Sequence, residues 1–169
     1  DPAPAPPTNE QQLSGGYKSA QDYTGKTTWD PITNKRILDL HPDVQGPATN
    51  FINQVEAELG ITLRVTQGLR TFKEQDDLFA QGRSASGPIV THAKGGESYH
   101  NYGLAIDVVE IINGKCNWNT NWELISEIGI QNGFEWGGNF KGFSDKPHFQ
   151  MTLGYSISEL IRLYNNGEW

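Results

Sequence analysis

The carboxylate of Asp107 interrupts the most apolar stretch of the chain, which runs from Leu104 to Ile112 and also contains Glu110. The β-branched residues of this stretch predict a buried strand, and a lone carboxylate is costly to bury without a partner. Gly103 and Ala105 precede Asp107 on the same face of such a strand, and both are very small. The open space that they leave could hold a bound cation. From the strand alone, a carboxylate paired with arginine or lysine, or lying at a sheet edge, remains an equal alternative.

Two of the histidines favour the cation. His100 lies shortly before the apolar strand, and His148 lies at the start of another expected strand. Two imidazoles and one carboxylate are a common ligand set for catalytic zinc, which activates water for hydrolysis. His41 is expected to begin a helix, and His92 to lie in a solvated loop that is close enough to approach a site. The sequence therefore predicts a zinc site formed by His100, Asp107 and His148.

Hydrolysis at such a site also needs a general base that is not a ligand. Asp145 lies three residues before His148, so both side chains can reach one site. Glu135 is the alternative base, although a carboxylate in its glycine-rich turn could instead anchor backbone amides. Arg70 follows a glycine that ends an expected strand, and its charge suits a developing oxyanion, unless it pairs with a surface acid. We favour Asp145 as the base and Arg70 as the cation.

Apolar periodicity predicts an α+β domain around these residues. Helices are expected over 42–59, 72–80 and 122–131, with a last helix beginning at 156 or 158. Strands are expected over 61–65, 104–112 and 149–153, with a turn or short strand over 134–138. Because these elements do not alternate as βαβ units, the pattern favours a small antiparallel sheet flanked by helices. The long loop over 81–102 is of a length that often carries function.

The first 28 residues are expected to form a tether, and residues 29–169 the folded domain. The chain opens with DPAPAPP, a proline density that favours an extended segment, and continues rich in Gly, Ser and Gln. A tether suggests an upstream leader, lipid anchor or further domain, although no charged-then-apolar leader opens the sequence. No apolar run approaches the roughly 20 residues that span a bilayer.

Charge and cysteine content narrow the possible partners. The formal net charge of -7 argues against nucleic acid, because binding to phosphates needs a basic face. The single cysteine, Cys116, cannot form an intrachain disulfide or a thiolate-rich zinc site. Its surroundings, Asn-Gly-Lys-Cys-Asn, indicate a turn in a hairpin rather than a nucleophile. We expect a soluble monomer with no membrane span.

Several motifs together resemble the LAS-type zinc peptidases. They are Gly68–Thr71 with Glu74 and Gln75, Gly82–Ser84, Ser98–Asp107, Gly133–Gly138 and Pro147–Phe149. This family includes the VanY and VanX D-Ala-D-Ala peptidases and the L-alanyl-D-glutamate endopeptidases of bacteria and phage endolysins. The pattern is most similar to the endopeptidase branch and covers roughly residues 40–153. It implies a Hedgehog/DD-peptidase-like fold, a small antiparallel sheet flanked by helices.

The resemblance also implies a role for each matching position. The zinc ligands are matched by His100, Asp107 and His148. The catalytic carboxylate is matched by Asp145, and the arginine that polarises the scissile carbonyl by Arg70. Gln75 and Ser98 match positions that line the substrate cleft. The VanX and VanY branches have Glu where this chain has Asp145, so the shorter side chain must hold its water in a slightly different geometry.

The implied activity is hydrolysis of peptidoglycan stem peptides at the L-Ala-D-Glu bond by a zinc metallopeptidase. A D-Ala-D-Ala or L,D carboxypeptidase that acts by the same chemistry is the alternative. A peptidoglycan-binding module that has lost activity is an alternative of another class, although no ligand or base is missing here. The expected location is the bacterial cell envelope, the periplasm or the exterior, with delivery by a phage or a secretion system also open.

Overall fold

The structure is a computed structural model that describes residues 27–169. Of the expected tether over 1–28, all but Thr27 and Thr28 lie outside these residues. Thr28 is buried, and both its backbone N–H and its hydroxyl donate to Oδ1 of Asn34 at 2.8 Å. Within the described part of the chain, no helix is both long and apolar enough to cross a bilayer.

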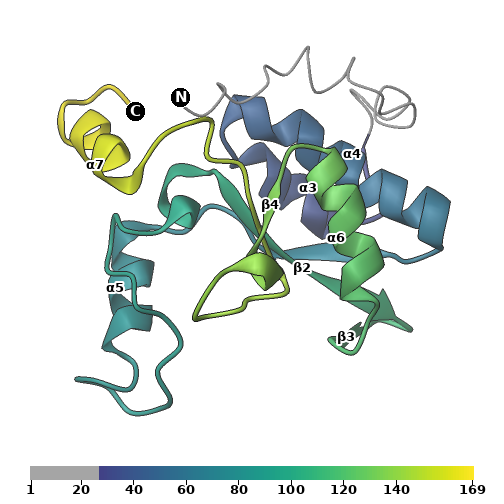
Figure 1. The fold of residues 1–169 in the computed structure, drawn as a ribbon, viewed down its shortest axis with the longest axis horizontal. Coiled ribbons are helices and arrows are strands. Elements are labelled where there is room, and N and C mark those ends of the chain that lie inside the picture. The colour runs from purple at the N-terminus through teal and green to yellow at the C-terminus, as the bar shows by residue number, and fades with distance from the viewer. Residues whose placement is uncertain (1–26) are drawn as a thin grey trace.

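A five-stranded antiparallel sheet lies at the centre of residues 27–169 (Figure 1). Its strands are β1 (Leu63–Gln67), β2 (Ala105–Ile112), β3 (Lys115–Asn117), β4 (Glu135–Trp136) and β5 (His148–Gln150). The order is β1-β2-β5-β4, and β3 forms a hairpin with the end of β2. The expected antiparallel sheet is therefore confirmed, although the last strand begins at His148 and ends at Gln150, sooner than its pattern predicted.

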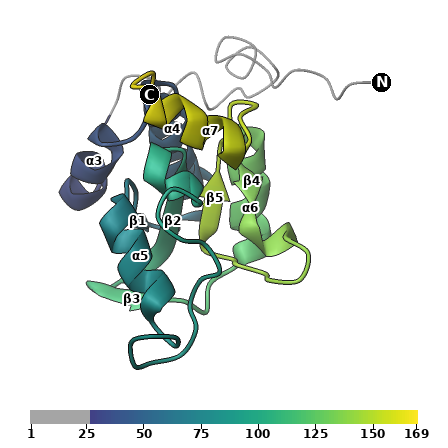
Figure 2. The ribbon, with the colours of Figure 1, turned by 90° about the vertical axis from the view of Figure 1, so that its left-hand side faces the viewer.

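Helices cover this sheet unequally. The contacts of α3 (Pro31–Leu38), α4 (Pro42–Leu59) and α6 (Trp122–Gln131) with one another and with the strands form a layer on one face. On the other side lie α5 (Phe72–Ala80) and α7 (Ile157–Asn165), with the single turns η1 (Tyr99–Tyr102) and η2 (Gly137–Asn139) near the strand ends. Figure 2 is seen from the side of α5 and shows α5 in front of the sheet, with α4 and α6 behind it. One face of the sheet is thus left for a site.

Strand register separates an apolar face from a polar one, because successive side chains point to opposite sides of a sheet. Val65 pairs with Val108, and Ile106 pairs with Phe149. All four are fully buried and belong to the core under the helices. Asp107 is the next residue after Ile106, so it lies on the opposite face, toward α5, where it pairs with His148.

The periodicity of the sequence did not predict α3, whose stability comes from polar contacts. Asp30 caps the helix, and its carboxylate accepts from the backbone N–H groups of Ile32 and Thr33, while Pro31 suits the first turn. The same carboxylate is 2.8 Å from Nε of Arg64 on β1 and is almost fully buried. A cap and an ion pair therefore hold a helix that has only a narrow apolar face.

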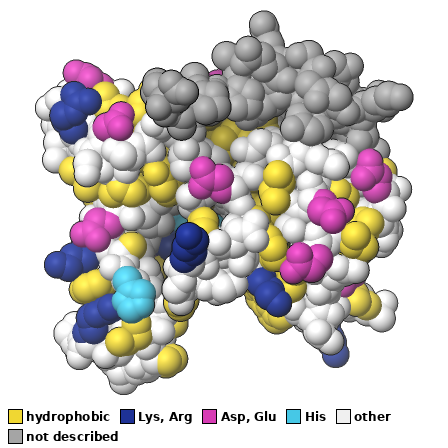
Figure 3. Space-filling model, in the orientation of Figure 1, with side chains coloured by type: hydrophobic (Ala, Val, Ile, Leu, Met, Phe, Trp, Pro, Cys, Tyr) yellow, Lys and Arg dark blue, Asp and Glu magenta, His cyan; other side chains and the backbone are white. Residues whose placement is uncertain are grey.

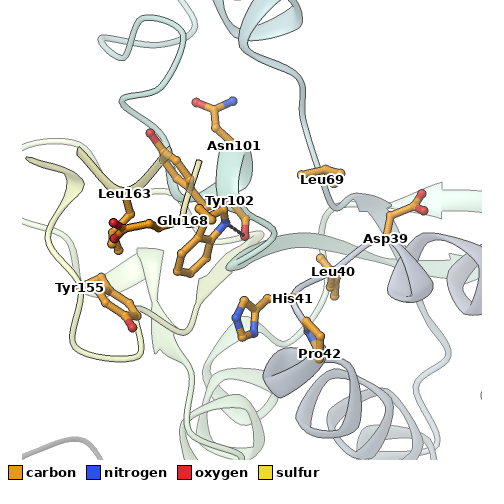
Figure 4. A pocket seen from close by; sticks show the side chains of 11 residues that line it. Asp39, Leu40, His41, Pro42, Leu69, Asn101, Tyr102, Tyr155, Leu163 and Glu168 are labelled. Carbon is orange, nitrogen blue, oxygen red and sulfur yellow. Dashed lines mark hydrogen bonds between the residues drawn. The ribbon is translucent and has the colours of Figure 1, made fainter. Parts of the chain in front are cut away.

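The last described residues close over η1 and the start of α4 (Figure 4). The ring of Trp169 lies 5.1 Å from that of His41, and its indole N–H donates to the carbonyl of Tyr102 at 3.3 Å. His41 also accepts from the N–H of Asp43 and caps α4, which confirms its expected place at a helix start. These aromatic rings line a pocket of about 620 Å³ that contains none of the expected metal ligands.

Candidate metal centre and catalytic cleft

Three side chains from separate segments converge on one point. Asp107 Oδ1 lies 3.3 Å from Nε2 of His100 and 3.2 Å from Nδ1 of His148. One possible ligand atom from each residue lies within 4.8 Å of the others, and residues 27–169 contain no other such group. Both histidines are buried, whereas Asp107 is partly exposed to a cleft. The structure thus brings together the three residues predicted from the sequence.

Local structure fixes each of these side chains. Asp107 and His148 are a cross-strand pair between β2 and β5. His100 lies in η1, where the hydroxyl of Ser98 accepts from the N–H of His100 at 3.2 Å. The side chain of Asn101 closes the capping box by accepting from the N–H of Ser98. Ser98 therefore positions a ligand as well as lining the cleft.

The donor atoms suit a divalent metal ion such as zinc. Nδ1 of His100 is 2.9 Å from the carbonyl oxygen of Gly68. A carbonyl only accepts, so Nδ1 carries the hydrogen and Nε2 keeps its lone pair toward Asp107. Nε2 of His148 is 2.9 Å from Oε1 of Gln150, which leaves Nδ1 facing the same point. Two imidazole nitrogens and a carboxylate, with the cleft on their open side, are a typical donor set for catalytic zinc.

The electrostatics of the triad also favour a cation. Burial by itself would raise the pKa of Asp107, but its contacts with the imidazoles of His100 and His148 hold it well below its usual range. Burial by itself would lower the pKa of His148, but the contact with Asp107 raises it above its ordinary value. The site therefore attracts positive charge, and a divalent ion can take the place of the bound proton.

Arg70 extends beside Asp107 into the same cleft. Its NH2 lies 3.9 Å from Oδ2 of Asp107, and its NH1 donates to Oε1 of Gln75 at 2.8 Å. Its backbone N–H donates to the carbonyl of His100 at 3.0 Å, which fixes it next to the ligand. Among the described residues, the buried Nε of Arg70 has no hydrogen-bond partner. A buried N–H of this kind is suited to an oxygen of a bound substrate.

Gln75 lies behind Arg70 rather than on the cleft surface. Its side chain is fully buried. Its oxygen accepts from Arg70, and its amide nitrogen donates to the carbonyl of Ala93 at 2.8 Å. The resemblance implied a position that lines the cleft. The structure places Gln75 where it orients Arg70 and ties the loop around Ala93 to α5.

Asp145 lines the cleft from the loop before β5. Its N–H donates to the carbonyl of Gly137 at 2.9 Å, and its carbonyl accepts from the N–H of His148 at 3.2 Å. A Cβ atom at residue 137 would collide with the Asp145 carbonyl oxygen, so this close approach requires glycine. Burial and the negative charge of Asp107 raise the pKa of Asp145. A carboxylate with this higher proton affinity suits a general base.

The cleft around the triad has a volume of about 680 Å³. Its walls come from α5, the loop that follows α5 and the loop before β5, and Figure 3 shows it as a hollow with basic side chains nearby. His92 reaches the cleft wall, where its ring meets that of Phe143 edge-on at 6.0 Å. Glu135 is not among the described residues that line the cleft. Of the two expected candidates for the base, the geometry favours Asp145.

Gln150 belongs to the site, although none of the sequence motifs singled it out. It is buried two residues after His148 on the same face of β5, and its amide contacts the ring of His148. Its amide nitrogen donates to Glu135 at 3.1 Å. Period-two alternation from His148 was the only available signal, and a three-residue strand is too short to make it visible.

This sheet, with a His-Asp-His triad in an open cleft, is typical of a metallopeptidase, and solved structures share its fold. Serratia marcescens L-Ala D-Glu endopeptidase ChiX has a TM-score of 0.54 at 23% identity, over 76% of this chain and 92% of that one. A vancomycin resistance D,D-pentapeptidase VanY mutant with Zn(II) has a TM-score of 0.52 at 17% identity, over 76% and 79%. The expected fold is therefore confirmed.

Sequence comparison gives the family. Residues 91–151 match the M15 peptidase model described as D-alanyl-D-alanine carboxypeptidase. The chain is also 47% identical over 124 residues to the peptidoglycan L-alanyl-D-glutamate endopeptidase CwlK of Bacillus subtilis (strain 168), a match that covers 67% of this chain and 74% of the relative. The chain belongs to the M15 family of peptidases, as its resemblance to the LAS-type enzymes implied.

Proposed function

We propose that this protein is a zinc-dependent endopeptidase that cleaves the L-alanyl-D-glutamate bond of peptidoglycan stem peptides. The observation that carries the proposal is the 47% identity to a peptidoglycan L-alanyl-D-glutamate endopeptidase. The convergence of His100, Asp107 and His148 in an open cleft supports the same reaction. Because peptidoglycan lies outside the cytoplasmic membrane, the protein would act in the envelope or after secretion.

The three converging residues would hold the zinc ion, which when bound polarises the scissile carbonyl and lowers the pKa of the attacking water. Asp145 takes a proton from the attacking water and passes it to the leaving amine. Arg70 directs its guanidinium, including the unpartnered Nε, toward the oxygen that gains negative charge. Gln75 keeps that guanidinium in place by accepting from its NH1.

A carboxypeptidase acting on terminal D-Ala is the second candidate, favoured by the description of the family model that matches residues 91–151. A stem pentapeptide that contains both bonds separates the two. Incubation with the zinc-loaded protein, followed by mass spectrometry, should yield a fragment with D-glutamate as its new amino terminus. Release of free D-alanine with no such fragment would support the carboxypeptidase. Cleavage of neither bond would indicate a module that binds without catalysis.

A further inference from the structure

We infer that Gln150 and Glu135 form a positioning relay that holds His148 in the tautomer able to bind the metal. The inference rests on the proposed function only in taking the triad to be a zinc site. It assigns a role to Glu135, which the sequence offered as the alternative to Asp145 for the general base. It also explains why an amide side chain is buried beside a ligand.

The contacts form an unbroken chain from the surface to the triad. The exposed carboxylate of Glu135 accepts from Nε2 of Gln150 at 3.1 Å. Oε1 of Gln150 lies 2.9 Å from Nε2 of His148. On the other side of the ring, Nδ1 of His148 lies 3.2 Å from Oδ1 of Asp107. The ring of His148 thus faces Gln150 with one nitrogen and the triad with the other.

The strands bring these groups together. Glu135 on β4 pairs with Gln150 on β5, so the two side chains are neighbours on one face. On the other side of β5, Gln150 pairs with Ala105 of β2, whose methyl group leaves room for the longer amide. His148 lies on the same face, two residues before Gln150. The sheet therefore sets the spacing of the relay.

Donor and acceptor chemistry gives the relay its direction. A carboxylate only accepts, so the contact with Glu135 requires the NH₂ end of the Gln150 amide to point outward. The amide oxygen must then face His148, and Nε2 of the ring must carry the hydrogen. In the neutral ring this leaves Nδ1 with its lone pair toward the triad, the form that a metal ligand needs. The orientation of the amide and the tautomer of the ring both follow from the one carboxylate.

Breaking the relay should weaken metal binding without removing a ligand. Without Glu135, the Gln150 amide can turn over and donate to Nε2 of His148, which favours the tautomer with a hydrogen on Nδ1. Zinc would then have to reverse that choice before binding. Residues in the outer shell of a metal site typically change affinity by about 10- to 100-fold when they are replaced.

Chelator competition with zinc alone as the probe tests the relay. We expect Gln150→Leu to weaken zinc binding by about 10- to 100-fold and Glu135→Ala by about 3- to 10-fold. The double variant should bind no more weakly than Gln150→Leu, because Glu135 acts only through Gln150. Nitrogen-15 NMR of the zinc-loaded protein should show the His148 ring with its hydrogen on Nε2.

Glu127→Ala, which removes an exposed carboxylate on α6, is the control and should leave zinc affinity unchanged. If Gln150→Leu fails to fold, the exposed Glu135→Ala decides alone. Wild-type affinity in Glu135→Ala would overturn the relay, as would additive losses in the double variant. Zinc affinity is measured without substrate, so a protein that cleaves neither stem-peptide bond yet shows the expected affinities would refute the proposed function and leave the relay intact.

Discussion

Asp107 lies at the meeting point of three groups that can carry positive charge. His100 and His148 contact one of its oxygens, and Arg70 lies 3.9 Å from the other. The sequence pointed to this position because a carboxylate in an apolar strand must be compensated. Arg70 does pair with Asp107, as the alternative expected, but at a longer distance than either imidazole. Burial in a cleft with two imidazoles is what makes the residue a metal ligand in our interpretation.

At the residue scale, the roles of Asp145 and the ligands can be separated. Asp145→Asn removes the group that accepts the proton and keeps the size of the side chain. We expect kcat/KM to fall by about 10²- to 10⁴-fold, the usual contribution of a general base, while bound zinc stays at the wild-type level. Steady-state kinetics with metal analysis checks both. Activity within threefold of wild type would rule out Asp145 as the base.

Single residues were predictable where their chemistry conflicts with their surroundings. Asp107 stands out in the sequence for that reason, whereas His100 and His148 were selected by their positions beside expected strands. The contacts of Gln75 and Gln150 did not stand out, because a glutamine carries no charge and its partner is chosen by the fold. Gln75 meets Arg70 across one turn of chain, and Gln150 meets Glu135 across two strands. Such contacts depend on how the elements pack and on strand register, which sequence patterns indicate only weakly.

At the scale of elements, length decided what could be predicted. β2 and α4 are long enough for their periodicity to be visible, with 8 and 18 residues. β4 and β5 have only 2 and 3 residues and were anticipated at shifted or uncertain bounds. α3 was missed because its stability comes from a cap and an ion pair with a distant strand. These contacts leave no periodic signal.

The cap of α3 gives a pH-dependent prediction. Burial by itself would raise the pKa of Asp30, but hydrogen bonds from Arg64 and Thr33 lower it below the ordinary value. Its stabilising effect is therefore complete above the unfolded pKa of about 3.9 and is lost as the pH falls through the lower folded value. Asp30→Asn keeps the cap and removes the charge. We expect it to cost about 2 kcal/mol of unfolding free energy at pH 7.

Urea unfolding of Asp30→Asn and the wild type at pH 7 and at pH 3 measures this effect. The difference between the two proteins should shrink at pH 3, because this pH lies below the unfolded pKa and Asp30 of the unfolded wild type then takes up a proton. Asp30→Ala, which also loses the cap, should cost about 1 kcal/mol more at both pH values. A difference between Asp30→Asn and wild type that is the same at both pH values would mean that the ion pair with Arg64 contributes nothing.

Gly137 in η2 gives a second prediction at this scale. A methyl group at this position would collide with the carbonyl of Asp145 and lie 2.9 Å from Cβ of His148. Gly137→Ala should therefore displace the loop that carries the base and lower kcat/KM by at least about tenfold, a cost of about 1.4 kcal/mol in the barrier. Gly142→Ala, where a Cβ meets nothing within 4 Å, is the control on the same loop, although its φ of +84° adds some strain. Equal activity in both variants would contradict the steric argument.

At the scale of the whole molecule, one face of the sheet is given to stability and the other to chemistry. Helices α3, α4 and α6 cover the apolar face, on the far side of the sheet from α5 (Figure 2). The cleft opens on the other face, beside α5. The sequence predicted this α+β class because its elements do not alternate as βαβ units. It did not predict how the loop after α5 and the loop before β5 close the cleft, since neither has a periodic pattern. The net charge of -7 does not by itself identify a binding partner.

In our proposal the protein uses zinc, held by this triad, to cut the stem peptide after L-alanine. Digestion of purified peptidoglycan with the metal-stripped protein, before and after zinc is restored, tests it most directly. We expect new D-glutamate amino termini to appear only after zinc is added, and not with Asp145→Asn. The same termini at an equal rate without zinc, or free D-alanine as the sole product, would contradict the claim.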